Sequence, residues 1–294
     1  MRNWGLFIFI LLLIPCHFTM AVNIHKAIYG RDDRYNANSP VLKAMHLRTI
    51  RATAAQVNKR MLKDFEQTAF YKLTSKDYKT LRNLCPGEEE MFKDEMSGLD
   101  CSGFLVGEDT LISAAHCFKS SFKCRGYSWV FDFKSDILHT RGHAYIEKRN
   151  VYDCKEVLHK EQDSEKGIDY VIVKLDRKVE GRPFLKLQSH ELISDNAKLF
   201  TVGHPSGLPV KVALNGHVIN NEFDHYFTTD LDTFVGNSGS PVLNEDTGLV
   251  EGILTRGHLD FSYDKDLRCN KVIHCTAQTC DGEAVMRASA ISGL

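Results

Sequence analysis

The residues with the clearest chemical potential form the segment Gly236-Asn237-Ser238-Gly239-Ser240-Pro241. Glycines on both sides of Ser238 permit a tight turn, which would bring main-chain N–H groups close to a carbonyl group attacked by the serine hydroxyl. The same residue types are common in ordinary turns, so this segment alone does not distinguish a nucleophile from a surface loop. A serine also needs a neighbouring base, which another part of the chain must supply.

The strongest candidate for that base is His116, in Ser113-Ala114-Ala115-His116-Cys117 at the end of an apolar run. Because the chain has 13 histidines, any one of them could be an ordinary surface or core residue. A bridge between Cys101 and Cys117 would fix the histidine loop against the start of its strand. This context favours His116 as the general base.

A buried carboxylate is then needed to hold the imidazole in one tautomer and to stabilise its cation. Asp169 stands at the start of the apolar run Ile168-Asp169-Tyr170-Val171-Ile172-Val173, where an unpaired acid would be costly to bury. Asp163 and Asp176 are the alternatives, but both lie in polar stretches typical of solvated turns. We therefore predict that Asp169 orients His116.

The elements that must position these residues are short β-strands. Residues 103–106, 127–133 and 170–175 are rich in β-branched and aromatic side chains and are separated by Gly, Asp and Asn, which predicts an all-β fold. A polar stretch at 176–196 indicates a link between two halves. Before Cys101, apolar residues recur at roughly helical spacing among many charges: Leu47, Ile50, Ala54, Val57, Met61 and Phe65.

Together these motifs resemble the chymotrypsin-like serine peptidases, with Cys101-Ser102-Gly103-Phe104 leading to Ala114-Ala115-His116-Cys117, then Asp169, then the Ser238 segment. The Gly-Asn-Ser-Gly-Ser-Pro form is similar to the bacterial glutamyl-endopeptidase-like branch, as is Ala27-Ile28-Tyr29-Gly30-Arg31-Asp32-Asp33-Arg34. The resemblance implies two six-stranded antiparallel β-barrels with the active site in the cleft between them. It also implies an oxyanion hole made by the N–H groups of Gly236 and Ser238, and a small hydroxyl residue, Thr255, beside the buried acid.

The resemblance also locates the residues expected to bind substrate. Asp232 lies at the offset from Ser238 where trypsin-like members carry the acid that binds Arg or Lys, which favours cleavage after basic residues. The glutamyl branch instead uses a Thr at the position of Thr233 together with a His, but Leu254 occupies the position of that His. We therefore expect Asp232, Thr233, Thr255 and Gly257 to contact substrate. Arg256 or the nearby His258 is a candidate substitute for the missing His.

Two further expectations concern activation and metal binding. Asn237 replaces the acid that captures the new N-terminal ammonium group in digestive enzymes, so the usual zymogen switch is not expected. We expect no cofactor and no metal. A zinc site made by Cys269, His274, Cys275 and Cys280 remains the alternative.

Composition limits the cellular context and the partners. The 37 basic and 38 acidic residues nearly cancel, so no global field favours nucleic acid or an anionic membrane. Arg2 followed by an apolar run and small residues near Ala21 predicts a signal peptide, because the run is too short to span a bilayer. Lipidation at Cys16 is a minor alternative, since Pro15 stands where a small residue is required.

The chain has nine cysteines, and an even number remains if Cys16 leaves with the signal peptide. In an exported protein this favours disulfides: Cys101–Cys117, Cys124–Cys154 and two more among Cys85, Cys269, Cys275 and Cys280. The expected organisation is a signal peptide at 1–21, an N-terminal pro-segment or wrapping extension at 22–97, and barrels at 98–182 and 183–294.

The leading hypothesis is a secreted or periplasmic serine endopeptidase acting on proteins or peptides, with protein inhibitors as further partners. The competing hypotheses are an inactive binding module on a protease scaffold, a glutamate-specific endopeptidase, and an esterase. The esterase is disfavoured because the Ser238 segment does not have the nucleophile-elbow pattern.

Overall fold

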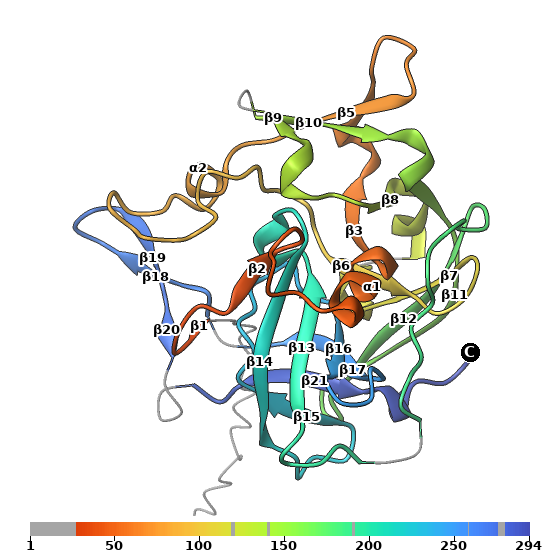
Figure 1. Cartoon of the computed structure of the whole chain (residues 1–294), viewed down its shortest axis with the longest axis vertical. Coiled ribbons are helices and arrows are strands. Elements are labelled where there is room, and N and C mark those ends of the chain that lie inside the picture. Colours follow the sequence, from red (N-terminus) through yellow and green to blue (C-terminus); the bar gives the residue numbers. More distant parts are fainter. Residues whose placement is uncertain (1–27, 119–120, 140–141, 190–191, 258, 276–279) are drawn as a thin grey trace, which may run out of the picture.

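The computed structural model of this chain describes residues 28–118, 121–139, 142–189, 192–257, 259–275 and 280–294. The signal peptide expected at 1–21 lies outside the described residues. Over the described ranges the chain is mostly β-structure with few helices, arranged around two closed barrels (Figure 1). The predicted all-β, two-barrel fold is therefore confirmed.

Six antiparallel strands close the first barrel in the order β11-β12-β7-β6-β3-β8. They are β3 (Thr53–Asn58), β6 (Ser102–Leu105), β7 (Thr110–Ser113), β8 (Tyr127–Phe131), β11 (Val151–Asp163) and β12 (Ile168–Leu175). Strand β12 is buried on both faces: Val171 and Val173 pack in the barrel core, whereas Tyr170 and Ile172 join a cluster that includes residues of the second half. This double burial explains the nearly continuous apolar run after Asp169.

The N-terminal boundary of this barrel differs from the expected residue 98. Strand β3 belongs to the segment expected to be a pro-segment or extension, yet it pairs with β6 through Ala55 and Ser102 and with β8 through Ala55 and Val130. The helical pattern expected over residues 47–65 is also interrupted, because the α-helix α1 (Ala44–Ala52) ends where β3 begins, and only a short 3-10 turn (Lys59–Met61) follows. Residues 53–57 are all buried, and this tertiary burial overrides the local spacing.

The second barrel follows the order β13-β16-β17-β21-β15-β14, closed by pairing of β13 with β14. Its strands are β13 (Lys198–Gly203), β14 (Lys211–Asn220), β15 (Tyr226–Thr229), β16 (Pro241–Asn244), β17 (Val250–Arg256) and β21 (Glu283–Arg287). Strand β2 (Arg34–Asn36) adds to the outer edge of β14. The N-terminal segment thus contributes strands to both halves of the molecule.

Smaller elements lie around the barrels. A four-stranded sheet has the order β4-β5-β10-β9, β1 pairs with β20, and β18 pairs with β19, near which α2 lies in Figure 1. Their bounds are β1 (Ile28–Tyr29), β4 (Leu62–Asp64), β5 (Phe70–Thr74), α2 (Tyr78–Arg82), β9 (Leu138–His139), β10 (His143–Glu147), β18 (Phe261–Asp264), β19 (Cys269–Val272) and β20 (His274–Cys275).

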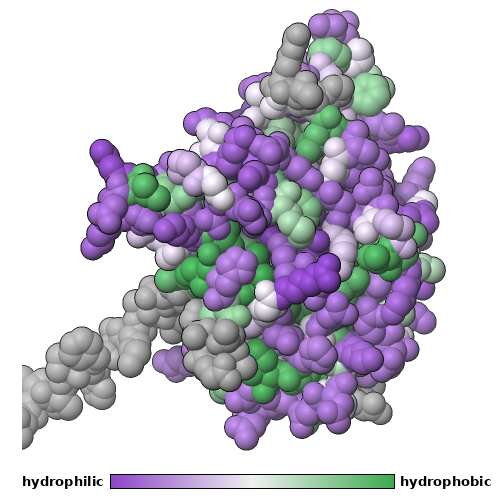
Figure 2. All heavy atoms as spheres, turned by 60° about the vertical axis from the view of Figure 1, so that its left-hand side comes forward, coloured by the Kyte–Doolittle hydropathy of each residue, from purple (hydrophilic) through white to green (hydrophobic). Residues whose placement is uncertain are grey.

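Four disulfides cross-link the chain, which confirms the prediction that its cysteines are oxidised. The pairs are Cys85–Cys269, Cys101–Cys117, Cys124–Cys154 and Cys275–Cys280. The first joins the N-terminal segment to β19 across a sequence separation of 184 residues. The face of the molecule in Figure 2 is mostly hydrophilic with smaller hydrophobic areas. Within the described ranges, no helix is long and apolar enough to span a bilayer.

Candidate active site

His116 and Asp169 come from neighbouring strands of the first barrel. His116 lies in a short 3-10 turn (Ala115–Cys117) after β7, and Asp169 is the second residue of β12, which pairs with β7. One carboxylate oxygen accepts from the main-chain N–H of His116 at 2.9 Å, and the other lies 2.6 Å from Nδ1. When Nδ1 carries the proton and donates it to Asp169, Nε2 is left as the basic nitrogen.

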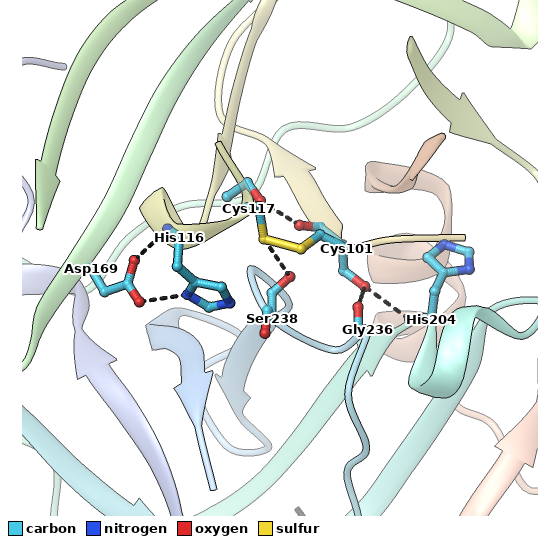
Figure 3. Close-up of a disulfide and its surroundings, with 9 residues drawn as sticks. Cys101, His116, Cys117, Asp169, His204, Gly236 and Ser238 are labelled. Atoms are coloured by element: carbon cyan, nitrogen blue, oxygen red, sulfur yellow. Dashed lines mark hydrogen bonds and ion pairs between the residues drawn. A yellow bond between two sulfur atoms is a disulfide. The ribbon is translucent and has the colours of Figure 1, made fainter. Parts of the chain in front are cut away.

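Ser238 lies in the loop before β16, and its side chain is drawn on the far side of the His116 ring from Asp169 (Figure 3). The main chain of this loop is held by both halves of the molecule: Ser102 N–H donates to the Ser238 carbonyl at 2.9 Å, and Gly239 N–H donates to Leu254 at 2.8 Å. Gly239 has a φ of +88°, and a Cβ there would lie 2.1 Å from the carbonyl oxygen of Ser102. Glycine is therefore required beside the nucleophile candidate.

The two main-chain donors expected next to Ser238 depend on the orientation of the Val235–Gly236 peptide. The Val235 carbonyl accepts from Ser206 N–H at 2.5 Å, and a trans peptide directs the Gly236 N–H to the opposite side. Gly236 has a φ of +103°, and an added Cβ would lie 2.5 Å from the carbonyl oxygen of His204. This orientation leaves the Gly236 N–H directed away from Ser206.

Two supporting residues were not predicted from the sequence. Ser102 Oγ donates to the Gly236 carbonyl and accepts from His204 N–H, at 2.9 Å in each case. His204 is buried, and its Nδ1 lies 3.0 Å from the carbonyl oxygen of Leu208. Burial lowers the pKa of His204 to about 4. The only sequence signal was the position of Ser102 directly after Cys101.

A cavity of about 130 Å³ opens beside His116 and Asp169. Its lining includes Gln162 and Ser164 from the first barrel, and Thr255 and Arg256 from the second. The cavity therefore offers space for a small group beside the His116–Asp169 pair, and residues of both barrels line it.

Thr255 was expected to place its hydroxyl beside the buried acid. It does line this cavity together with Asp169, but its Oγ1 donates to the Ala284 carbonyl at 3.3 Å. The hydroxyl therefore faces β21.

The alternative acids make different contacts. Asp163 accepts from the N–H groups of Glu165 and Lys166, and Asp176 accepts from the N–H of Asp153. Asp163 therefore caps the turn between β11 and β12, whereas Asp176 binds the main chain of β11.

Asp232 does not have the surroundings expected of a substrate-binding acid. Its two carboxylate oxygens accept from Tyr29 N–H at 2.6 Å and Asp33 N–H at 2.7 Å, and the residue is 3 % exposed. Burial raises its pKa to about 7. The expectation for Asp232 relied only on its spacing from Ser238 along the chain. That spacing does not reveal that Tyr29 and Asp33, about 200 residues earlier, donate to both oxygens of the carboxylate.

Thr233 and Gly257, which were also expected to bind substrate, lie against Glu283, an acid that was not predicted to be near the site. Thr233 Oγ1 donates to Glu283 Oε2, and a Cβ at Gly257 would lie 2.2 Å from the same oxygen. His258 lies outside the described residues. Arg256 packs over the ring of Tyr226, with its guanidinium carbon 4.9 Å from the ring centroid.

The alternative zinc site is not supported by the cysteine chemistry. Cys269, Cys275 and Cys280 are all in disulfides and present no thiolate. Donor atoms of Cys101, His116 and Cys117 do lie within 4.8 Å of one another. These two cysteines are also bonded to each other, so this group has no thiolate ligand.

Comparisons with known proteins agree with this architecture. A solved structure titled "Structure of Glu endopeptidase in complex with MPD" superposes with a TM-score of 0.50 at 12 % identity, covering 90 % of this chain and 94 % of the other. The structure of human heparin binding protein gives 0.50 at 13 % identity, covering 82 % and 88 %. At these identities the likeness shows the fold alone. No curated protein matches the sequence.

The sequence itself carries the family assignment. The family model described as a trypsin-like peptidase domain matches residues 101–253, which include His116, Asp169 and Ser238. The chain belongs to the family of trypsin-like peptidase domains.

Proposed function

We propose that this chain is a serine endopeptidase in which Ser238 is the nucleophile, His116 the general base and Asp169 the residue that orients it. The observation that carries the proposal is the pair of hydrogen bonds from His116 to Asp169, at 2.9 Å and 2.6 Å, in a chain of the peptidase family. These bonds fix both the position and the tautomer of the imidazole next to Ser238.

The proposed reaction starts with transfer of the Ser238 hydroxyl proton to Nε2 of His116 as the oxygen attacks a peptide carbonyl. Asp169 stabilises the imidazolium that forms, without itself taking the proton. His116 then gives the proton to the leaving amine, and an acyl-enzyme ester remains on Ser238. In the second half of the reaction, His116 activates water, which hydrolyses the ester and regenerates Ser238.

The N–H groups of Gly236 and Ser238 are the proposed oxyanion donors. The hydrogen bond from Ser206 to Val235 supports this role, because it turns the Gly236 N–H away from Ser206. Such donors typically contribute about 3 to 4 kcal/mol each, since they point to where negative charge develops in the transition state.

We further propose that the protein is exported to an oxidising compartment and acts there on protein or peptide substrates. The four disulfides support this location, because such bonds persist outside reducing compartments. The apolar N-terminal run is consistent with a signal peptide.

Labelling with a fluorophosphonate probe tests the mechanism, because the probe reacts only with an activated serine. The intact protein should be labelled, Ser238→Ala should not, and the matched variant Ser128→Ala, a buried serine that donates to Asp153 in the first barrel, should be labelled normally. A folded protein that neither reacts with the probe nor cleaves peptides would favour an inactive binding module.

A further inference from the structure

Val235, in the loop before Ser238, is held by its main chain and not by its side chain, which is 44 % exposed. Its N–H donates to Asp260 Oδ2 at 2.9 Å, and its carbonyl accepts from Ser206 N–H at 2.5 Å. Because each peptide unit is planar, residues outside the loop fix both of the peptide planes that meet at Val235.

The peptide between Val235 and Gly236 is the centre of a β-turn. Asn237 N–H donates to the Phe234 carbonyl at 2.9 Å, and the φ of +103° at Gly236 is typical of a type II turn. In a type I turn this central peptide is reversed, so its carbonyl takes the side that the N–H occupies here. Since glycine permits both conformations, the surrounding hydrogen bonds must select the one that presents the Gly236 N–H as an oxyanion donor.

Asp260 lies in the connection between β17 and β21, directly before β18. It is buried, and its carbonyl accepts from Ile273 N–H at 2.9 Å. The disulfide Cys85–Cys269 attaches β19 to the N-terminal segment, and Cys85 N–H donates to the Asn270 carbonyl at 2.9 Å. The hairpin of β18 and β19 is accordingly drawn near α2 of that segment (Figure 1). These contacts fix the main chain from which the Asp260 carboxylate reaches Val235.

Ser206, the donor on the other side of Val235, is attached to the same N-terminal segment. The hydroxyl of Ser97 donates to the Ser206 carbonyl. Ser206 has a φ of 52°, a conformation that is uncommon for a residue with a side chain and that this attachment helps to hold. The segment that is bonded to β19 through Cys85 therefore also supports the second contact to Val235.

We propose that Asp260 is a positioning residue for the oxyanion hole, because its hydrogen bond to Val235 keeps the Gly236 N–H facing the substrate carbonyl. This inference rests on the proposed endopeptidase function. The contact is made by a side chain within the fold and needs no new N-terminal ammonium group, which agrees with the presence of Asn237 in place of an acid. Loss of this bond should weaken stabilisation of the transition state and leave substrate binding in place.

Three variants in and beside β18 test this role with a peptide substrate. Asp260→Ala removes the acceptor for Val235 N–H and should lower kcat by about 10- to 100-fold with KM unchanged. Asp260→Asn keeps a side-chain oxygen that can accept the same hydrogen bond, so its kcat should stay within about threefold of the intact protein. Asp264→Ala removes the acceptor for the N–H groups of Asp266 and Leu267 at the turn of the hairpin, and it should leave kcat unchanged.

A matched pair of ester and thionoester substrates reports on the oxyanion hole itself. The thionoester replaces the carbonyl oxygen with sulfur, which accepts hydrogen bonds weakly, so an intact oxyanion hole favours the ester. The ester-to-thionoester ratio of kcat/KM should fall by at least about fivefold in Asp260→Ala and stay within about twofold in Asp260→Asn and Asp264→Ala. A structural defect elsewhere would lower both rates equally and leave this ratio unchanged.

The role of Asp260 is overturned if Asp260→Ala leaves the ratio unchanged, or if Asp260→Asn loses as much kcat as Asp260→Ala. If Asp260→Ala does not fold, Asp260→Ser takes its place with the same expected ratio, because its hydroxyl is too short to reach Val235 N–H. Labelling to completion with the fluorophosphonate probe counts the active sites, so that unfolded protein does not enter kcat. An intact protein that is folded but unlabelled would overturn the endopeptidase function itself, whereas a labelled one with an unaffected Asp260→Ala would overturn only the role of Asp260.

Discussion

Asp169 accepts two hydrogen bonds from the same residue, one from the main-chain N–H of His116 and one from its Nδ1. The first bond fixes the turn that carries the histidine, and the second fixes the ring. The position of His116 and the tautomer of its ring are therefore both set by the Asp169 carboxylate. A substitution of Asp169 can remove the bond to the ring and keep the bond to the main chain.

Asp169→Asn should lower kcat by on the order of 10⁴-fold, because an amide NH₂ favours the wrong imidazole tautomer. Its remaining oxygen can still accept from the main-chain N–H of His116, so the fold should persist. Steady-state kinetics and the rate of fluorophosphonate labelling measure the loss. Asp163→Asn, at a turn acid, is the control, and an equal loss in that variant would contradict the special role of Asp169.

Ser102→Ala should lower kcat by about 10- to 100-fold with little change in KM, because the Gly236 carbonyl loses the hydrogen bond that fixes its peptide. The free energy of unfolding should also fall by about 1 to 3 kcal/mol, since Gly236 O and His204 N are left without this partner. Ser128→Ala, another buried serine, should lose stability without a comparable loss of kcat.

Acid should destabilise the protein through His204. Its folded-state pKa of about 4 lies below the ordinary value of 6.5, so the unfolded chain binds the additional proton between these pH values. The stabilisation is complete above pH 6.5 and is lost as the pH falls to 4, by on the order of 3 kcal/mol. Urea unfolding of His204→Gln should show a shallower pH dependence than the intact protein, whereas exposed His217→Gln should not.

Removal of the Cys85–Cys269 disulfide should lower the free energy of unfolding by about 2 to 5 kcal/mol, because it closes a loop with a sequence separation of 184 residues. Removal of Cys275–Cys280, with a separation of 5, should cost less in the chain-entropy model. Urea unfolding of the two double-alanine variants compares these losses. Equal destabilisation would contradict an effect governed by loop length.

The features that could be predicted from the sequence are the local ones. Asp169 could be proposed because it is the one charged residue at the start of an apolar strand, and Ser238 because glycines flank it. The two-barrel fold followed from the short strands and the resemblance that these motifs carry. In each case the evidence lay within a few residues of the feature.

The features that were missed depend on partners far along the chain. Strand β3 had a locally helical spacing, and only its pairing with β6 and β8 reveals a strand. The surroundings of Asp232 are set by Tyr29 and Asp33, and those of Thr233 by Glu283. A motif offset can locate such residues near a site, but it does not reveal which atoms their side chains face.

The origin of β3 in the N-terminal segment has a consequence for recombinant fragments. A polypeptide beginning at Cys101, where the family match begins, would lack the strand between β6 and β8. Both neighbours would then expose unpaired N–H and C=O groups, which readily template intermolecular β-pairing. Such a fragment should form aggregates, and co-expression with residues 28–100 should recover soluble material by strand complementation.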